Sequence, residues 1–198
     1  MSRFRVLAPA AALVLLPTTT HAHLVNTGLG PFYDGVSHFA LTPEDLLPAL
    51  ALALLAGQGG ARAGRLSLFA LPMAWLLGGI GGLAFPTVTY APALTTVSFL
   101  ALGGLVAAEA RLPAEWVTGL AVVFGLVHGY LNGAAMSQAK LGALGLVGIV
   151  STLFVTVALA AALVVAIRVP WGRIAVRVAG SWIAAVGLLL LGWSLRAA

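Results

Sequence analysis

The segment from Leu141 to Ile167 has the sequence LGALGLVGIVSTLFVTVALAAALVVAI and contains no charged residue. A helix that crosses a bilayer needs about 20 mostly apolar residues, so this segment is long enough to span a membrane. The rest of the 198-residue chain is similar in character, because 61% of its residues are hydrophobic and 8% are charged. Soluble domains carry roughly 25% charged residues, and the composition therefore predicts an integral membrane protein.

Five further apolar runs lie on either side of this segment, separated by proline, glycine or charged residues. We expect an all-α, polytopic transmembrane bundle of about six helices joined by short loops. At the start of the first helix, Thr42 is suited to the capping position, Pro43 to the first turn, and Glu44 and Asp45 to the positive helix end. The predicted helices cover residues 42–56, 66–85, 93–108, 116–131, 141–167 and 178–195.

The N-terminal residues 1–22 have the features of a secretory signal peptide. Arg3 and Arg5 precede a short apolar core, and an A-x-A-like cleavage site follows. An uncleaved first anchor is the alternative, but an apolar run of about a dozen residues is short for a span. The mature membrane domain would then be residues 23–198, and the amine and imidazole of a free His23 terminus could chelate a metal.

The basic residues predict the orientation, because short cytoplasmic loops retain most of the Lys and Arg. Six arginines fall in alternate connections, on the side expected to be cytoplasmic, whereas Lys140 and Arg196 fall on the opposite side. Together with the signal peptide, this pattern predicts a multi-pass protein of the inner (plasma) membrane with both mature termini periplasmic or extracellular. The charged loops form no basic stripe, which argues against a nucleic-acid partner and leaves the lipid bilayer as the main one. The residues expected on the cytoplasmic side are Arg62, Arg65, Arg111, Arg168, Arg173 and Arg177.

Ionisable residues near membrane spans are costly to bury and are therefore the candidates for function. Asp34 and His38 lie four residues apart, and Asp45 follows seven residues later. His128 and Asn132 show the same four-residue spacing near the outer end of the helix predicted at residues 116–131. The segment from residue 23 to residue 41 is too polar for a lipid-facing span and is expected outside. Both groups should lie at a similar depth, so we expect them to form one site.

Imidazole and carboxylate groups suit divalent nickel, cobalt, copper or zinc, with nickel above cobalt in intrinsic affinity. The chain has no Cys, which excludes thiolate ligands and disulfides. Other roles stay open: a single His in a helix can make a structural hydrogen bond, Asp45 can serve only the helix start, and Asn132 can join helices. Glu109 lies beside Arg111, and a local ion pair or snorkelling is expected there.

Three stretches of the chain resemble one known family. GPFYDGVSH at residues 30–38 and TPEDLLP at residues 42–48 resemble the HupE/UreJ family of hydrogenase- and urease-associated membrane proteins, closer to its second, less characterised branch. GLVHG at residues 125–129 is similar to the family's second histidine motif, G-x-x-H-G. The better-known branch has an acid directly before the first histidine, where this chain has Ser37. The family also often has a second histidine or an acid shortly after the G-x-x-H-G motif, where this chain has Asn132.

The resemblance implies a permease for a divalent transition metal, with nickel as the first choice, that supplies urease or hydrogenase maturation. The metal would be the transported substrate, without a prosthetic group and without catalysis. Two other functions remain open. His38, His128 and Asp34 could hold zinc in an intramembrane hydrolase, or the chain could be a non-catalytic accessory subunit.

Overall fold

The computed structural model describes residues 26–87 and 91–196. In this part of the chain, the regular secondary structure consists of helices joined by loops. The expected signal peptide and His23 lie outside the described residues. Each of the six predicted helices is present, and a further helix precedes them. The described helices are α2 (Pro31–Leu41), α3 (Pro43–Gln58), α4 (Ala61–Ala84), α5 (Pro92–Ala107), α6 (Ala114–Gln138), α7 (Gly142–Ala166) and α8 (Pro170–Arg196).

Four of these helices are long and apolar enough to cross a membrane alone: α4, α6, α7 and residues Pro170–Trp193 of α8. The α2–α3 pair, bent by 71°, passes the same test jointly, as expected of a broken span or a re-entrant loop, which gives up to five spans if the pair is counted as one. The expected number of about six spans is therefore not reproduced. With 16 residues each, α3 and α5 are about 24 Å long, short of the roughly 30 Å of a hydrocarbon core.

Helix α2 lies in the polar segment that the sequence places on the outer side of the membrane. It packs along α7, where a Cβ on Gly35 would lie 2.0 Å from the carbonyl oxygen of Gly145. Its polar residues Asp34 and His38 are buried. The polarity that excluded a lipid-facing span is thus directed into the protein, where it costs less.

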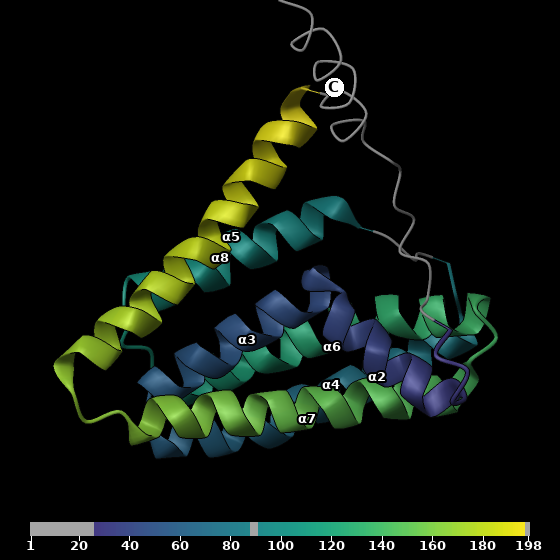
Figure 1. Ribbon diagram of the computed structural model, residues 1–198, viewed down its shortest axis with the longest axis horizontal. Helices are drawn as coiled ribbons and strands as arrows, with labels where there is room; N and C mark the ends of the chain where they lie inside the picture. Colours follow the sequence, from purple (N-terminus) through teal and green to yellow (C-terminus); the bar gives the residue numbers. More distant parts are fainter. Residues whose placement is uncertain (1–25, 88–90, 197–198) are drawn as a thin grey trace, which may run out of the picture.

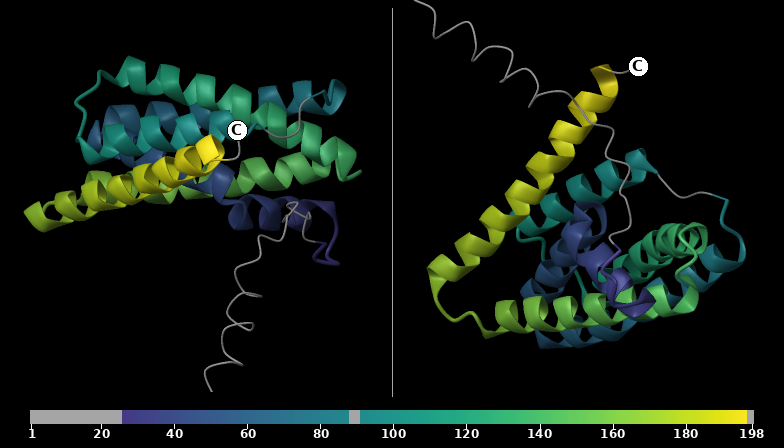
Figure 2. Two further views of the ribbon diagram at one scale, coloured as in Figure 1. Left: turned by 90° about the horizontal axis from the view of Figure 1, so that it is seen from above. Right: turned by 45° about the vertical axis from the view of Figure 1, so that its right-hand side comes forward.

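The helices form a main bundle and an attached pair. Helices α3, α4, α6 and α7 run roughly along the long axis of the molecule, while α5 and α8 pack against each other on one side and α8 leans away from α7 (Figures 1 and 2). Helix α3 contacts every other described helix. A side chain on α3 can therefore meet residues from distant parts of the sequence.

Close contacts between glycine-bearing faces join α4 and α6. A Cβ on Gly78 would lie 2.1 Å from the carbonyl oxygen of Leu126, and one on Gly133 would lie 2.0 Å from that of Gly79. Contacts this short leave no room for a side chain. These glycines serve helix packing, as small residues commonly do between membrane helices.

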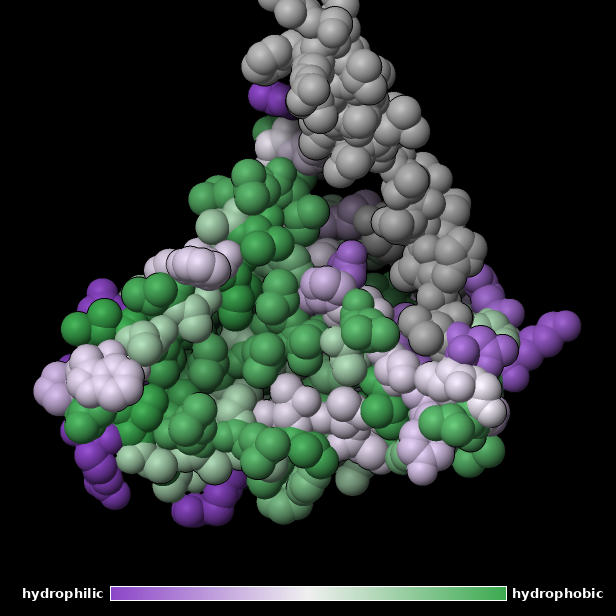
Figure 3. Space-filling view, in the orientation of Figure 1, coloured by the Kyte–Doolittle hydropathy of each residue, from purple (hydrophilic) through white to green (hydrophobic). Residues whose placement is uncertain are grey.

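One end of the bundle is basic. The α3–α4, α5–α6 and α7–α8 connections lie together at the left in Figure 1, and the six arginines expected in the cytoplasm lie in these connections or in the first two turns of α4 and α8. Arg62 pairs with Glu115 at 2.7 Å, and Arg173 pairs with Glu109. The expected partner of Glu109 was Arg111, but the packing of α8 against α5 brings Arg173 closer. Apolar residues cover much of the face between the ends (Figure 3). We call this arginine-rich region the basic end.

Candidate metal-binding site

The break between α2 and α3 follows from one proline. Pro43 disfavours helical geometry at the residue before it, and Thr42 adopts φ −102° and ψ 97°, an extended conformation. Pro43 itself fits the first turn of α3, as expected. Thr42 holds the N-cap position, but its side chain makes no capping hydrogen bond, contrary to expectation. The bend places Asp45, in the first turn of α3, inside the bundle.

Asp45 lies between two buried imidazoles. Its Oδ1 is 3.1 Å from Nδ1 of His128 on α6, and its Oδ2 is 4.0 Å from Nε2 of His38 on α2. The three residues are 6%, 2% and 8% exposed, respectively. An ionised carboxylate only accepts hydrogen bonds, so the contact with His128 calls for a proton on Nδ1. The role of Asp45 as a simple helix-start acid does not account for this position.

The second nitrogen of His128 faces a hydroxyl group. Ser98 Oγ lies 3.1 Å from Nε2 of His128 and 2.8 Å from the carbonyl oxygen of Leu94, and its single proton can be donated to one of these two acceptors at a time. With the proton on Nδ1, a neutral imidazole keeps its lone pair on Nε2. A carboxylate on one nitrogen and an unprotonated second nitrogen is the arrangement that metal-ligating histidines commonly show.

Aromatic rings hold His128 in place. Trp75 of α4 lies 5.5 Å away between ring centroids, and Phe124, one turn earlier on α6, lies 6.2 Å away and is stacked. Both rings lie beside the imidazole. They limit its rotation and leave Ser98 and Asp45 as its polar neighbours.

The two remaining predicted residues have separate roles. Asn132 Nδ2 donates to the carbonyl oxygen of His128 at 3.0 Å, while its Oδ1 is buried without a hydrogen-bond partner. Asp34 Oδ1 accepts hydrogen bonds from the backbone nitrogen and the hydroxyl of Thr27, both at 2.7 Å. Asn132 thus offers a free acceptor next to His128, whereas one oxygen of Asp34 already has two donors.

The predicted convergence of the two sequence-distant groups is observed for His38, Asp45 and His128. Within residues 26–87 and 91–196, however, no three His, Cys, Asp or Glu side chains are arranged to hold a metal ion without movement. A metal would need side chains to turn, with Ser98 leaving Nε2 of His128. The available donors are imidazole nitrogens and carboxylate or amide oxygens, a set that suits divalent nickel, cobalt or zinc.

Sequence reasoning missed Ser98, Trp75 and Phe124. Their types gave little signal, because a serine in an apolar helix and an aromatic residue in a span are both common. The clue for Ser98 was the grouping of Thr95, Thr96 and Ser98 on one short helix, and all three are buried. No pairing of this group with His128 could be inferred from spacing alone.

Comparison with known proteins identifies the family. The model of the family described as HupE / UreJ protein matches residues 11–190 of the chain. The chain belongs to the HupE/UreJ family. No curated protein and no solved structure matches it. The match extends over all of the helices described above except the last residues of α8.

The two glycines of the HupE/UreJ-like GLVHG segment, residues 125–129, are explained by helix packing. A Cβ on Gly129 would lie 2.1 Å from the carbonyl oxygen of Trp75, and one on Gly125 would lie 2.7 Å from the Cβ of Ala74. The two glycines therefore bring α6 against α4. This contact sets His128 beside Trp75 and directs its ring toward α3 and α5.

Proposed function

We propose that this HupE/UreJ protein is a permease for a divalent transition metal, with nickel as the first choice, in the inner (plasma) membrane. The observation that carries the proposal is the buried carboxylate of Asp45 between the imidazoles of His38 and His128. A buried charge is costly unless it is paired, so a carboxylate at this depth suits a cation. The family membership supports the same function.

In the proposed site, His38 and His128 supply nitrogen ligands and Asp45 supplies charge. Asn132 Oδ1, which is buried and unpartnered, supplies a further oxygen. Asp34 belongs to the approach to the site, where its charge attracts cations. Because imidazoles bind metal only when neutral, uptake should fall in acid.

The proposed orientation places the basic end in the cytoplasm and both mature termini outside. The positive-inside rule supports it, because all six clustered arginines lie at that end. His128 lies in the second half of α6, away from the basic end, and α3 begins close to Asp45. The site would then receive metal from the outer side and pass it inward, for urease or hydrogenase maturation.

Uptake into proteoliposomes tests the function directly. Purified protein should accumulate nickel faster than empty vesicles, and cobalt, zinc and copper in parallel would rank the substrates. His38→Ala and His128→Ala should each abolish uptake, and the double variant should be no worse than either one, as expected of groups that act as a unit. Equal uptake by wild type and both variants would refute the proposal.

A further inference from the structure

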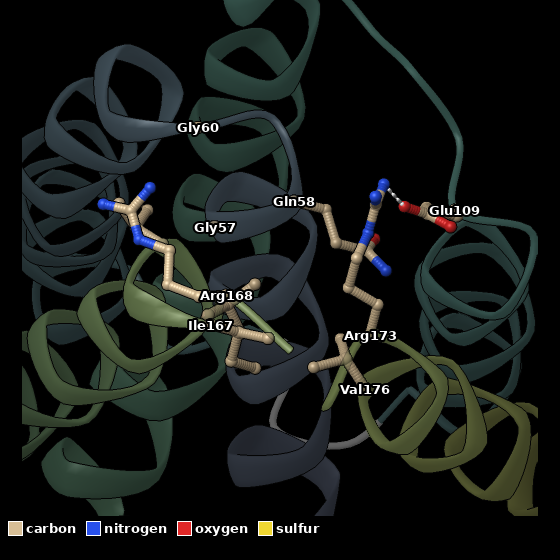
Figure 4. Close-up of a pocket in the computed structure, with 10 residues that line it drawn as sticks. Gly57, Gln58, Gly60, Glu109, Ile167, Arg168, Arg173 and Val176 are labelled. Carbon is tan, nitrogen blue, oxygen red and sulfur yellow. Dashed lines mark hydrogen bonds and ion pairs between the residues drawn. The ribbon is translucent and has the colours of Figure 1, made fainter. Parts of the chain in front are cut away.

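Two adjoining cavities open at the basic end, where α7 turns into α8 beside α5. Their volumes are about 400 and 390 Å³, and both are lined by Glu109, Arg168 and Arg173. Figure 4 shows the first cavity, with Arg168 on one side and the Arg173–Glu109 pair on the other. These cavities lie at the opposite end of the bundle from the proposed metal site.

The second cavity is strongly positive. Four guanidinium groups line it, those of Arg111, Arg168, Arg173 and Arg177, against the one carboxylate of Glu109. Glu109 pairs with Arg173, and Arg177 Nε donates to the carbonyl oxygen of Ala107 at 3.0 Å. Within the described part of the chain, Arg111 and Arg168 make no hydrogen bond or ion pair. Two free guanidinium groups in one cavity favour an anion with several acceptor oxygens.

The first cavity adds a buried acceptor. Gln58 Nε2 donates to the carbonyl oxygen of Val106 at 3.1 Å, but Gln58 Oε1 is buried without a partner. A buried acceptor that lacks a hydrogen bond costs free energy, and a ligand hydroxyl would supply the missing donor. Val164 and Val176 form a buried apolar wall beside it.

Exposed apolar side chains beside the cavities favour a lipid over a soluble anion. Ile174 on α8 lines the second cavity and is large, apolar and exposed, and Leu163 on α7 is an exposed apolar residue one position before Val164 of the first cavity. Acyl chains can lie along such surfaces while the head group enters the cavity. The first turn of α8 also lines the second cavity through Pro170 and Arg173, and the positive end of a helix dipole favours phosphate.

From these features we infer that the paired cavities bind one anionic phospholipid whose head group carries hydroxyl groups, such as phosphatidylglycerol. Arg168 and Arg111 hold the phosphodiester, and a head-group hydroxyl donates to Gln58 Oε1. The lipid fills the junction between α7 and α8, where α8 leans away from the main bundle. The inference does not depend on metal transport.

Binding can be measured on the full chain in neutral detergent by native mass spectrometry and by thermal unfolding during titration with phosphatidylglycerol. Each basic contact near a membrane surface contributes about a fivefold change in affinity. We therefore expect Arg168→Gln to weaken binding about fivefold. Arg65→Gln is the matched control, because Arg65 is exposed at the same end but lines neither cavity. Equal affinities for the two variants would overturn the site.

A second variant and two further ligands complete the test. Arg111→Gln, in the loop before α6, should weaken binding by a similar factor and replaces Arg168→Gln if that variant does not fold. Phosphatidylmethanol has the same charge without a head-group hydroxyl, so wild type should prefer phosphatidylglycerol, and Gln58→Leu should lose that preference. No preference in wild type would overturn the role of Gln58. Protection by glycerol phosphate equal to that by the lipid would overturn the choice of a lipid.

Discussion

The proposed site depends most on the charge of Asp45, and Asp45→Asn tests it with little change in shape. The amide keeps an oxygen for the proton on Nδ1 of His128, so the helices should stay in place. The variant loses the negative charge shared by His38 and His128. Nickel binding should weaken because a dication then enters a buried site without a compensating charge.

The size of the effect follows from the two contacts. A hydrogen bond to a charged group contributes about 1 kcal/mol more than a neutral one. The 3.1 Å hydrogen bond with His128 should lose this amount in full, and the electrostatic interaction with His38, which at 4.0 Å is too long for a hydrogen bond, about half as much. The sum is about 1.5 kcal/mol, which corresponds to a roughly tenfold loss of affinity. Any direct bond between the metal and the carboxylate would raise the loss further.

The neighbouring Glu44→Gln variant is the control, because it removes the same charge one residue away. Glu44 is half-buried and makes no hydrogen bond or ion pair in the described residues. Nickel affinity of the purified proteins, measured by isothermal titration calorimetry, should fall about tenfold for Asp45→Asn and less than about threefold for Glu44→Gln. Equal affinities for the two variants would refute the central role of Asp45.

Three other predictions concern packing, the histidine and the approach. Gly133→Ala should lower the free energy of unfolding by about 1–3 kcal/mol, because the new Cβ would lie 2.0 Å from the backbone of α4. Gly119→Ala on the same helix is the control and should be neutral, because its Cβ meets nothing within 4 Å. Equal melting temperatures for the two variants would contradict the packing. Ser98→Ala should strengthen nickel binding about two- to fivefold, because it removes the hydroxyl that contacts Nε2 of His128. Equilibrium dialysis measures the affinity, and weaker binding by the variant would indicate that the hydroxyl is itself a metal ligand. Asp34→Asn should slow uptake about twofold at low salt and less at high salt, and a salt-independent loss would place Asp34 in the site itself.

Much of the helical pattern could be predicted from hydropathy and from the proline, glycine and charged residues that separate the apolar runs. The start of α3 follows from Thr42 and Pro43, and the start of α7 lies one residue from its predicted position. The hydropathy pattern predicts the start of α8 eight residues too late, because Arg173 and Arg177 interrupt the apolar run. At a helix end, long arginine side chains can extend to the interface while the backbone stays helical, so charge alone does not mark the boundary.

The number of spans was harder to predict, because it depends on where short helices lie. Helices α3 and α5 both have 16 residues, but α3 is largely buried in the main bundle and α5 packs on α8. A window of hydropathy measures composition and not the angle between consecutive helices. The 71° bend at Thr42 therefore could not be derived, although Pro43 indicated that a helix begins there.

The convergence of His38, Asp45 and His128 could be predicted because it depended on depth alone. Two groups at one depth in a small bundle have few places to lie, and the burial cost of ionisable side chains brings them together. The partners of each group could not be predicted, since Ser98 reaches His128 only through the packing of α5 beside α3. The local sequence determined which residues lie at the same depth in the bundle. The glycine contacts between α4 and α6 determined which way the side chain of His128 faces.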